Sequence, residues 1–102
     1  MEKFILYVGL NDKDTKTQKI DTLSAYNLAN NILLNYVEGA TVTQSKGIYK
    51  HNNGNVVIEN TLIIELLFTD TATVEQIAND LKKALNQESI AIQKYNIESY
   101  LY

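Results

Sequence analysis

The sequence contains no cysteine, arginine, tryptophan or proline, and it has one histidine, His51. The lack of cysteine excludes thiolate nucleophiles, cysteine metal sites and a disulfide framework. The lack of arginine excludes the bidentate clamps that often hold phosphate or carboxylate groups. With a single imidazole, none of the four serines has a partnered base for hydrolase chemistry. Most enzyme chemistry is thereby removed, so we interpret the chain as a non-enzymatic binding protein and expect no cofactor.

Length and composition predict one domain over residues 1–102. A chain of 102 residues that is 45% hydrophobic can bury a single core without staples. Its net charge of -3 lacks the basic balance that neutralises nucleic-acid phosphates, so we expect no nucleic-acid partner. The apolar start at 4–10 is too short for a signal peptide or a membrane span, so we expect a cytoplasmic protein without a membrane partner. All nine basic residues are lysine, and this bias is typical of an AT-rich genome such as that of a phage.

The first third of the chain predicts a strand, a loop and a helix. Residues 3–10 alternate with period two and are apolar on both faces, which is typical of a central strand. Residues 11–19 are polar without periodicity and form a loop. A helix over about 22–37 follows, because apolar residues recur at i, i+3 and i+4. Asp21 or Thr22 is its expected N-cap, and Gly39 is expected to end it.

The rest of the chain predicts a hairpin, a second helix and a last strand. The turn at 51–55 contains an Asn-Gly pair, which supplies the positive φ angles of tight hairpins, between strands at about 41–49 and 56–68. In the return strand, Ile58 and Phe68 are expected on the face that meets the helices. Thr73 has capping-box spacing to Gln76, so a helix over about 74–86 is expected, followed by a strand over about 89–97.

The resulting order βαββαβ predicts an α+β protein of the ferredoxin-like class. In this sandwich, two helices cover one face of a four-stranded antiparallel sheet. The first and third strands are central in that topology, and they are the two runs that are apolar on both faces. Local and global patterns therefore predict the same architecture.

The other sheet face is expected to be an oligomer interface. Its apolar residues make a patch larger than a monomer usually leaves in water. An RNA-binding sheet would stack bases on aromatic residues of the central strands, and Tyr7 alone is available there. A tyrosine-rich chain end adds aromatic area to the expected contact, although packing of this segment on its own sheet edge is an alternative. The residues assigned to the interface are Ile5, Tyr7, Ile63, Leu67, Tyr95 and Tyr100.

Most patterns that carry catalytic or metal chemistry are incomplete. Glu59 and Glu65 share a strand face but lie about 20 Å apart at ~3.3 Å per residue, too far for a carboxylate pair. Asp12 and Asp14 have the spacing that starts a calcium loop, but the later glycine and glutamate are missing. No glycine spacing matches a phosphate-loop fingerprint. We therefore expect no metal site and no catalytic residues.

Two polar loops hold the remaining candidates for ligand binding. Lysine can hold a phosphate as a point charge, while tyrosine and asparagine can stack on a base and hydrogen-bond to it. The alternative is that both loops are ordinary solvated loops. The candidate residues are Asn11, Lys13 and Lys16 after the first strand, and Lys46, Tyr49, Lys50, His51 and Asn52 around the hairpin.

Three segments, LYVGLND (6–12), GATVTQSKGIYKHNNGNVVIENTLIIELLF (39–68) and NQESIAIQ (86–93), resemble a family of small bacterial and phage domains of unknown function. More distantly, the architecture resembles PII-type signalling proteins and the divalent-cation-tolerance family, which are ferredoxin-like oligomers that join through sheet edges and hairpins. In PII-type proteins, clefts between subunits bind nucleotides. The sequence carries no PII signature, so the resemblance implies self-association more than it implies a ligand.

Our leading hypothesis is a homo-oligomer that binds a small nucleotide-like phosphate ligand in clefts between subunits. In a phage, such a protein would sequester a host nucleotide signal. The alternative is a protein-interaction module, for example a phage inhibitor that docks its acidic surface or hairpin onto a host defence protein. A third interpretation, an enzyme with tyrosine and glutamate as acid–base groups, needs a general base that no sequence feature indicates.

Overall fold

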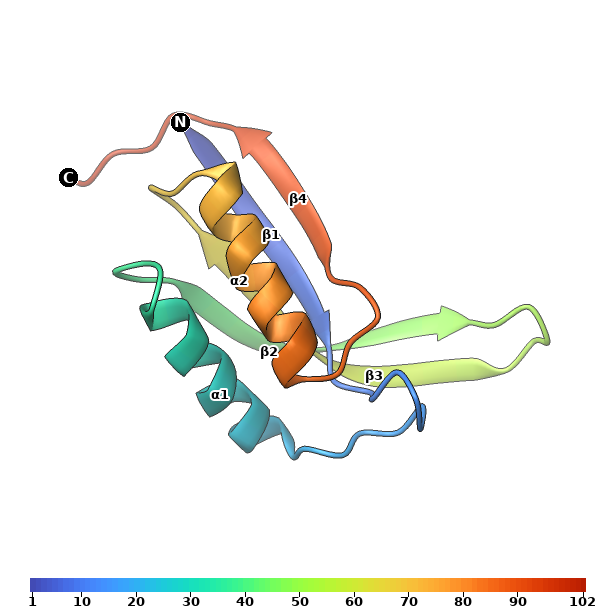
Figure 1. Ribbon diagram of the computed structural model, residues 1–102. Coiled ribbons are helices and arrows are strands. Elements are labelled where there is room, and N and C mark those ends of the chain that lie inside the picture. Colours follow the sequence, from blue (N-terminus) through green and yellow to red (C-terminus); the bar gives the residue numbers. More distant parts are fainter.

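A computed structural model describes all residues, 1–102, and contains four strands and two helices (Figure 1). Their order confirms the predicted βαββαβ arrangement. The elements are β1 (Glu2–Gly9), α1 (Thr22–Leu34), β2 (Thr41–Lys50), β3 (Val56–Leu66), α2 (Thr71–Ala84) and β4 (Ala91–Asn96).

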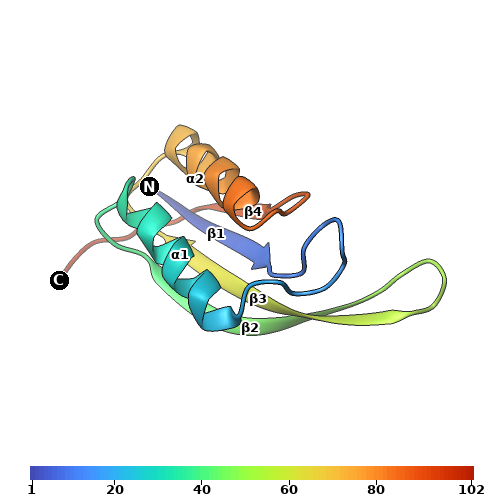
Figure 2. The ribbon, with the colours of Figure 1, turned by 60° about the horizontal axis from the view of Figure 1, so that its bottom comes forward.

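The strands form one antiparallel sheet in the order β2-β3-β1-β4. Both helices lie on the same face of this sheet, and the opposite face is covered by no element of the chain (Figures 1 and 2). The two strands predicted to be central, β1 and β3, are the central ones. The ferredoxin-like α+β fold is therefore confirmed.

The core lies between the sheet and the two helices. Phe4, Leu6 and Val8 of β1 and Leu62, Ile64 and Leu66 of β3 point towards the helices and are buried, as the period-two pattern predicts. Ala25 and Ala29 face this layer from α1, and their small side chains let the helix lie close to the sheet. The largest fully buried side chains are Phe4, Leu6, Val8, Leu33, Leu62, Ile64, Leu66, Val74, Ile77 and Leu81.

Aspartates begin both helices. The Asp21 carboxylate accepts a hydrogen bond from Ser24 N at 2.8 Å, as predicted, and Asp70 accepts one from Thr73 N, also at 2.8 Å. The predicted cap at Thr73 is wrong, because Asp70 is the N-cap and the helix starts at Thr71. The prediction that Gly39 ends α1 in a left-handed conformation is also wrong. The helix ends at Leu34, with Asn35 as its C-cap, and Gly39 has no positive φ.

Residues in the left-handed backbone conformation follow the ends of β3 and α2. Phe68, at a φ of 58°, turns the chain away after β3 and is 54% exposed, so the prediction that it faces the helices is wrong. Asn86, at a φ of 49°, follows α2. There the backbone N–H groups of Asn86 and Gln87 donate to Lys83 O and Lys82 O, which satisfies the last carbonyls of the helix.

The hairpin of β2 and β3 extends beyond the helices as a two-stranded arm (Figures 1 and 2). The predicted turn is confirmed: Gly54 has a φ of 88°, and His51 N donates to Asn55 O at 2.8 Å. Ile58 lies on this arm, paired with Ile48, and it is 62% exposed because no helix reaches it. The prediction that Ile58 joins the core is therefore wrong.

Neither α1 nor α2 has the length and apolar character that a membrane-spanning helix needs.

Candidate functional site

A groove of about 680 Å³ lies on the open sheet face, where the arm leaves the body of the protein. The end of β1, the 11–16 loop, the 87–89 loop and the base of the arm all contribute to its wall. Polar side chains predominate in it, which suits a polar ligand. The lining residues are Tyr7, Gly9, Asn11, Asp12, Lys13, Lys16, Gly47, Tyr49, His51, Val57, Glu59, Thr61, Gln87, Glu88, Ser89 and Ala91.

Glu59 is fixed against the end of β1 by a backbone hydrogen bond and by a glycine. Its Oε2 accepts from Asn11 N at 2.8 Å. The carboxylate lies over Gly9, where a Cβ would come within 2.6 Å of Cδ and of both carboxylate oxygens. Glycine at position 9 therefore leaves the space that the Glu59 carboxylate occupies.

The 11–18 loop is closed on itself by Asp12. Asp12 Oδ1 accepts from the backbone N–H groups of Asp14 at 2.9 Å and Thr15 at 3.1 Å. The main chain of Asp12 also bonds across the loop, donating to Thr17 O and accepting from Lys16 N, both at 2.8 Å. This loop, expected to be irregular, is an ordered wall of the groove.

The segment after α2 ties the same loop to the body of the protein. Asn86 Nδ2 donates to Asp12 Oδ2 and to Asp14 Oδ2, each at 2.9 Å, and Asn86 O accepts from Lys13 N at 3.0 Å. The buried Gln87 donates from Nε2 to Asn11 O at 2.8 Å. These bonds join residues more than 70 positions apart and fix one wall of the groove.

The same hydrogen bonds keep Asp12 ionised. The bond from the Asn86 side chain is the main cause, and the bonds from Thr15 N and Asp14 N add to it, so the pKa of Asp12 is lowered from 3.8 to about 2. Burial of the carboxyl opposes this shift in pKa. Asp12 is therefore a structural anion of the loop and cannot serve as a proton donor near neutral pH.

The two lysines of the groove form no salt bridge, although the carboxylates of Asp12, Glu59 and Glu88 line the same groove. The salt bridges of the structure join Lys3 to Glu65 and Lys94 to Glu2. Neither Lys13 nor Lys16 takes part in one, so both ammonium groups are available to an anionic ligand.

On the arm, the rings of Tyr49 and His51 lie 5.3 Å apart at 85° in an edge-to-face pair.

The structure brings together five of the eight candidate ligand residues, namely Asn11, Lys13, Lys16, Tyr49 and His51. Lys46, Lys50 and Asn52 do not line the groove. Side chains alternate along β2, so Lys46 and Lys50 point to the face opposite Tyr49, where Lys46 Nζ bonds Asn60 Oδ1 at 3.0 Å. Asn52 lies in the turn at the tip of the arm.

Sequence reasoning missed Glu59, Asn86 and Gln87 as parts of this site. Glu59 was considered only as half of a carboxylate pair with Glu65, which lines no part of the groove. One signal was available for Glu59, since period-two alternation places it on the same sheet face as Gly9 and Tyr49. No local pattern indicates the roles of Asn86 and Gln87, because their partners lie at the other end of the sequence.

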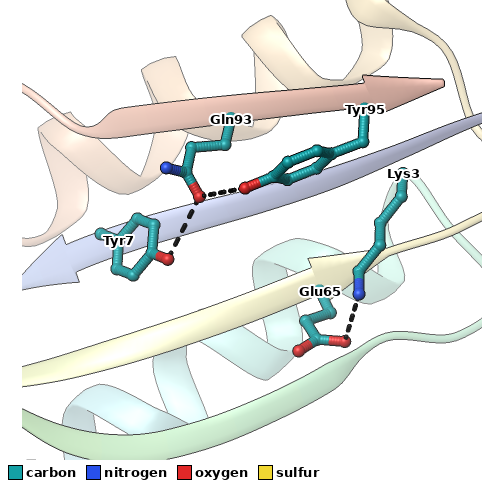
Figure 3. Close-up of polar contacts among 5 residues, drawn as sticks. All are labelled: Lys3, Tyr7, Glu65, Gln93 and Tyr95. Atoms are coloured by element: carbon teal, nitrogen blue, oxygen red, sulfur yellow. Dashed lines mark hydrogen bonds and ion pairs between the residues drawn. The ribbon is translucent and has the colours of Figure 1, made fainter.

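The open sheet face holds four of the six residues assigned to an interface, Ile5, Tyr7, Ile63 and Tyr95. Tyr7 is directly opposite Ile63 in the register, and Ile5 is opposite Glu65. Polar contacts cross this face: the hydroxyls of Tyr7 and Tyr95 donate to Gln93 Oε1 at 3.2 and 2.9 Å, and Lys3 pairs with Glu65 at 3.6 Å (Figure 3). The face is thus more polar than the prediction of an apolar patch implied.

The other two assigned residues lie beyond the ends of the strands. Leu67 follows the end of β3 and lines a separate hollow beside the 36–41 segment. Tyr100 lies in the extended segment after β4, where it is 75% exposed. The expected packing of this segment on its own sheet edge extends as far as Ile97, whose N–H donates to Met1 O at 3.0 Å.

No group of three or more histidine, cysteine, aspartate or glutamate side chains is arranged to hold a metal ion.

Residues 3–99 match the model of a family described as "Protein of unknown function (DUF3574)". No curated protein matches the sequence.

Several solved structures are similar in fold. A phage SAM lyase in complex with S-methyl-5′-thioadenosine has a TM-score of 0.67 at 20% identity, over 92% of this chain and 79% of that chain. The periplasmic divalent cation tolerance protein CutA from Archaeoglobus fulgidus has a TM-score of 0.59 at 18% identity, over 99% and 88% of the two chains. A DUF3240 family protein from Shewanella baltica has a TM-score of 0.57 at 9% identity, over 99% and 94%. At these identities, the likeness establishes the shared fold.

Proposed function

The chain belongs to the DUF3574 family of unknown function, and we propose that it binds a small nucleotide-like ligand in the groove between the 11–16 loop and the arm. Binding does not lead to a chemical reaction. The ligand is a phosphate-bearing nucleoside, and in a phage the protein would sequester such a molecule from its host.

One observation carries this proposal: side chains that suit the base and side chains that suit the phosphate of a nucleotide line the same groove. Tyr49 and His51 offer aromatic surface for a base. Lys13 and Lys16 offer unpaired ammonium groups for a phosphate. The volume of about 680 Å³ lies within the range of roughly 300–1,000 Å³ that is usual for small-molecule sites.

The fold is compatible with such a ligand. The phage SAM lyase with the same fold was solved with S-methyl-5′-thioadenosine, a nucleoside derivative. That compound has no phosphate, so it separates recognition of the nucleoside from recognition of the phosphate in a binding experiment.

A non-catalytic role is favoured by the state of the carboxylates. Asp12 is held ionised by the Asn86 amide and by backbone N–H groups, so it cannot act as a general acid near neutral pH. Glu59 also lines the groove, where its Oε2 accepts a hydrogen bond from Asn11 N. Glu65, six residues along the strand, lies beyond the groove and forms no carboxylate pair with Glu59.

Self-association is the second part of the proposal. A second copy would pack on the open face around Tyr7 and Ile63, which no element of this chain covers. Tyr7 also lines the groove, so a copy seated on this face would close one of its sides. The ligand site would then lie between subunits.

Isothermal titration tests the proposal with a panel of nucleoside mono- and triphosphates and with S-methyl-5′-thioadenosine. We expect at least one phosphorylated ligand to bind, and we expect Lys13→Ala combined with Lys16→Ala to weaken that binding at least about ten-fold. Lys46→Ala is the matched control, because this lysine lies on the opposite face of the arm. Absence of binding across the panel would refute the proposal.

A chromatographic assay tests the non-catalytic part. The protein is incubated with S-adenosylmethionine or with the ligand found by titration, and each compound is expected to be recovered unchanged. Turnover that is lost in Glu59→Gln would assign the protein to the enzymes instead.

A protein-interaction module is the second candidate, and the arm supplies the observation for it. On the face opposite the groove, Ile48, Val56 and Ile58 are each more than half exposed and flanked by Lys46 and Lys50. A host protein captured by the wild type, lost with Ile58→Asp and retained with Tyr49→Ala would favour this candidate.

A further inference from the structure

We infer that Glu59 recognises the ribose hydroxyls of the ligand and makes the groove selective for ribonucleotides over deoxyribonucleotides. This inference rests on the proposed function and names the residue that would set its specificity.

The Glu59 carboxylate is held in place but has hydrogen-bonding capacity left. An ionised carboxylate has about four acceptor positions on its two oxygens. One of them, on Oε2, is taken by Asn11 N at 2.8 Å, and no other hydrogen bond or salt bridge of the structure uses this side chain. A preformed acceptor that faces a groove selects ligand groups that donate hydrogen bonds.

The position of Glu59 along the groove corresponds to the sugar of a nucleotide. Tyr49 pairs with Val57 across the hairpin, and Gly47 pairs with Glu59, so Tyr49 and Glu59 are diagonal neighbours on one face, about 7–8 Å apart between Cα atoms. On the other side, Glu59 touches Asn11, two residues before Lys13. Along the backbone, Glu59 therefore lies between the strand that carries Tyr49 and the loop that carries the lysines, the order of base, ribose and phosphate in a nucleotide.

Charge decides which part of the ligand meets Glu59. A phosphate beside this carboxylate would be repelled, whereas Lys13 and Lys16 attract it. A ribose diol presents two hydroxyl donors without a charge, so it can satisfy the free acceptor positions. The lack of a Cβ at Gly9 leaves room for the Glu59 carboxylate against β1.

The test is titration of the four ribonucleoside 5′-monophosphates and their 2′-deoxy and 3′-deoxy counterparts. We expect the ribonucleotide that binds to do so about ten- to hundred-fold more tightly than its deoxy forms, the usual effect of losing a hydrogen bond to a charged group. Equal binding of ribo and deoxy forms would overturn the inference while leaving the proposed function standing. Absence of binding by every compound of this panel would overturn the inference, and absence of binding by the triphosphates and S-methyl-5′-thioadenosine as well would overturn the proposed function.

Two variants assign the selectivity to this residue. Glu59→Gln retains an oxygen for Asn11 N–H, so it is expected to fold, and it should reduce the ribo-to-deoxy ratio at least several-fold. Glu65→Gln makes the same change six residues along the same strand face, outside the groove, and should leave the ratio unchanged. A ratio that survives Glu59→Gln, with thermal unfolding showing a folded variant, would assign the selectivity to another group and refute the inference.

Discussion

We predict that a side chain at position 9 would displace the Glu59 carboxylate, and the substitution Gly9→Ala tests this prediction. The new Cβ would lie 2.6 Å from three atoms of the Glu59 carboxylate, well inside the ordinary carbon contact distance of about 3.5–4.0 Å. The φ of Gly9 is not in the positive region, so alanine can adopt the backbone without strain. The end of the Glu59 side chain must therefore shift, and we expect this shift to release Asn11 N.

The expected cost follows from the two effects of this change. Loss of a hydrogen bond to a charged acceptor costs about 1.5–3 kcal/mol. Alanine in place of glycine within a strand recovers about 0.5–1 kcal/mol, because it lowers the entropy of the unfolded chain. We therefore expect Gly9→Ala to lower the free energy of unfolding by about 1–2 kcal/mol, measured by urea denaturation.

A double-mutant cycle decides whether Glu59 is the cause. In the Glu59→Ala background, the clash and the hydrogen bond are both absent, so Gly9→Ala should be neutral or stabilising by up to about 1 kcal/mol. The coupling free energy between the two positions should then be about 1.5–3 kcal/mol. If Gly9→Ala costs the same in both backgrounds, to within about 0.5 kcal/mol, the steric argument is wrong.

Three further predictions follow from the loop and the sheet. The pKa of Asp12 is about 2 in the folded protein and 3.8 ordinarily, so the stability that this carboxylate contributes is present above pH 3.8 and is lost as the pH falls towards 2. Urea denaturation across this pH range should show a smaller loss of stability for Asp12→Asn than for the wild type. Gln87→Leu leaves Asn11 O and Leu85 O without their donor, and should lower the free energy of unfolding by about 1–3 kcal/mol and speed amide exchange over residues 11–17. Tyr7→Asp should halve the molar mass of a dimer, or lower that of a larger assembly to the monomer, in sedimentation; an unchanged mass would exclude the open face as the contact.

The core of the fold could be predicted from the sequence because it depends on periodicity. The alternation in β1 and β3 and the stripe of apolar residues in α1 each indicate which side chains are buried, and the burial of Leu6, Ile64 and Leu33 follows from them. The ends of elements were predicted less well. Asp70 and Thr73 are both reasonable caps, and the choice between them depends on where the chain leaves β3.

The site could be predicted only in part. Lys13, Lys16, Tyr49 and His51 were identified by their chemistry, and the structure brings them to one groove. Lys46 and Lys50 have the same chemistry but lie on the other face of the arm, since side chains alternate along β2. Ile58 was assigned to the core by the same alternation, which gives the face of a strand but not where the covering helices end.

By itself, the sequence determined the order of elements, the central strands and the residue types available for chemistry, because each of these depends on neighbours within a few positions. Only the tertiary structure decided that Glu59 lies over Gly9, and that Asn86 and Gln87 hold the 11–18 loop. These contacts join residues about 50 to 75 positions apart, and their geometry depends on the register and packing of the whole sheet.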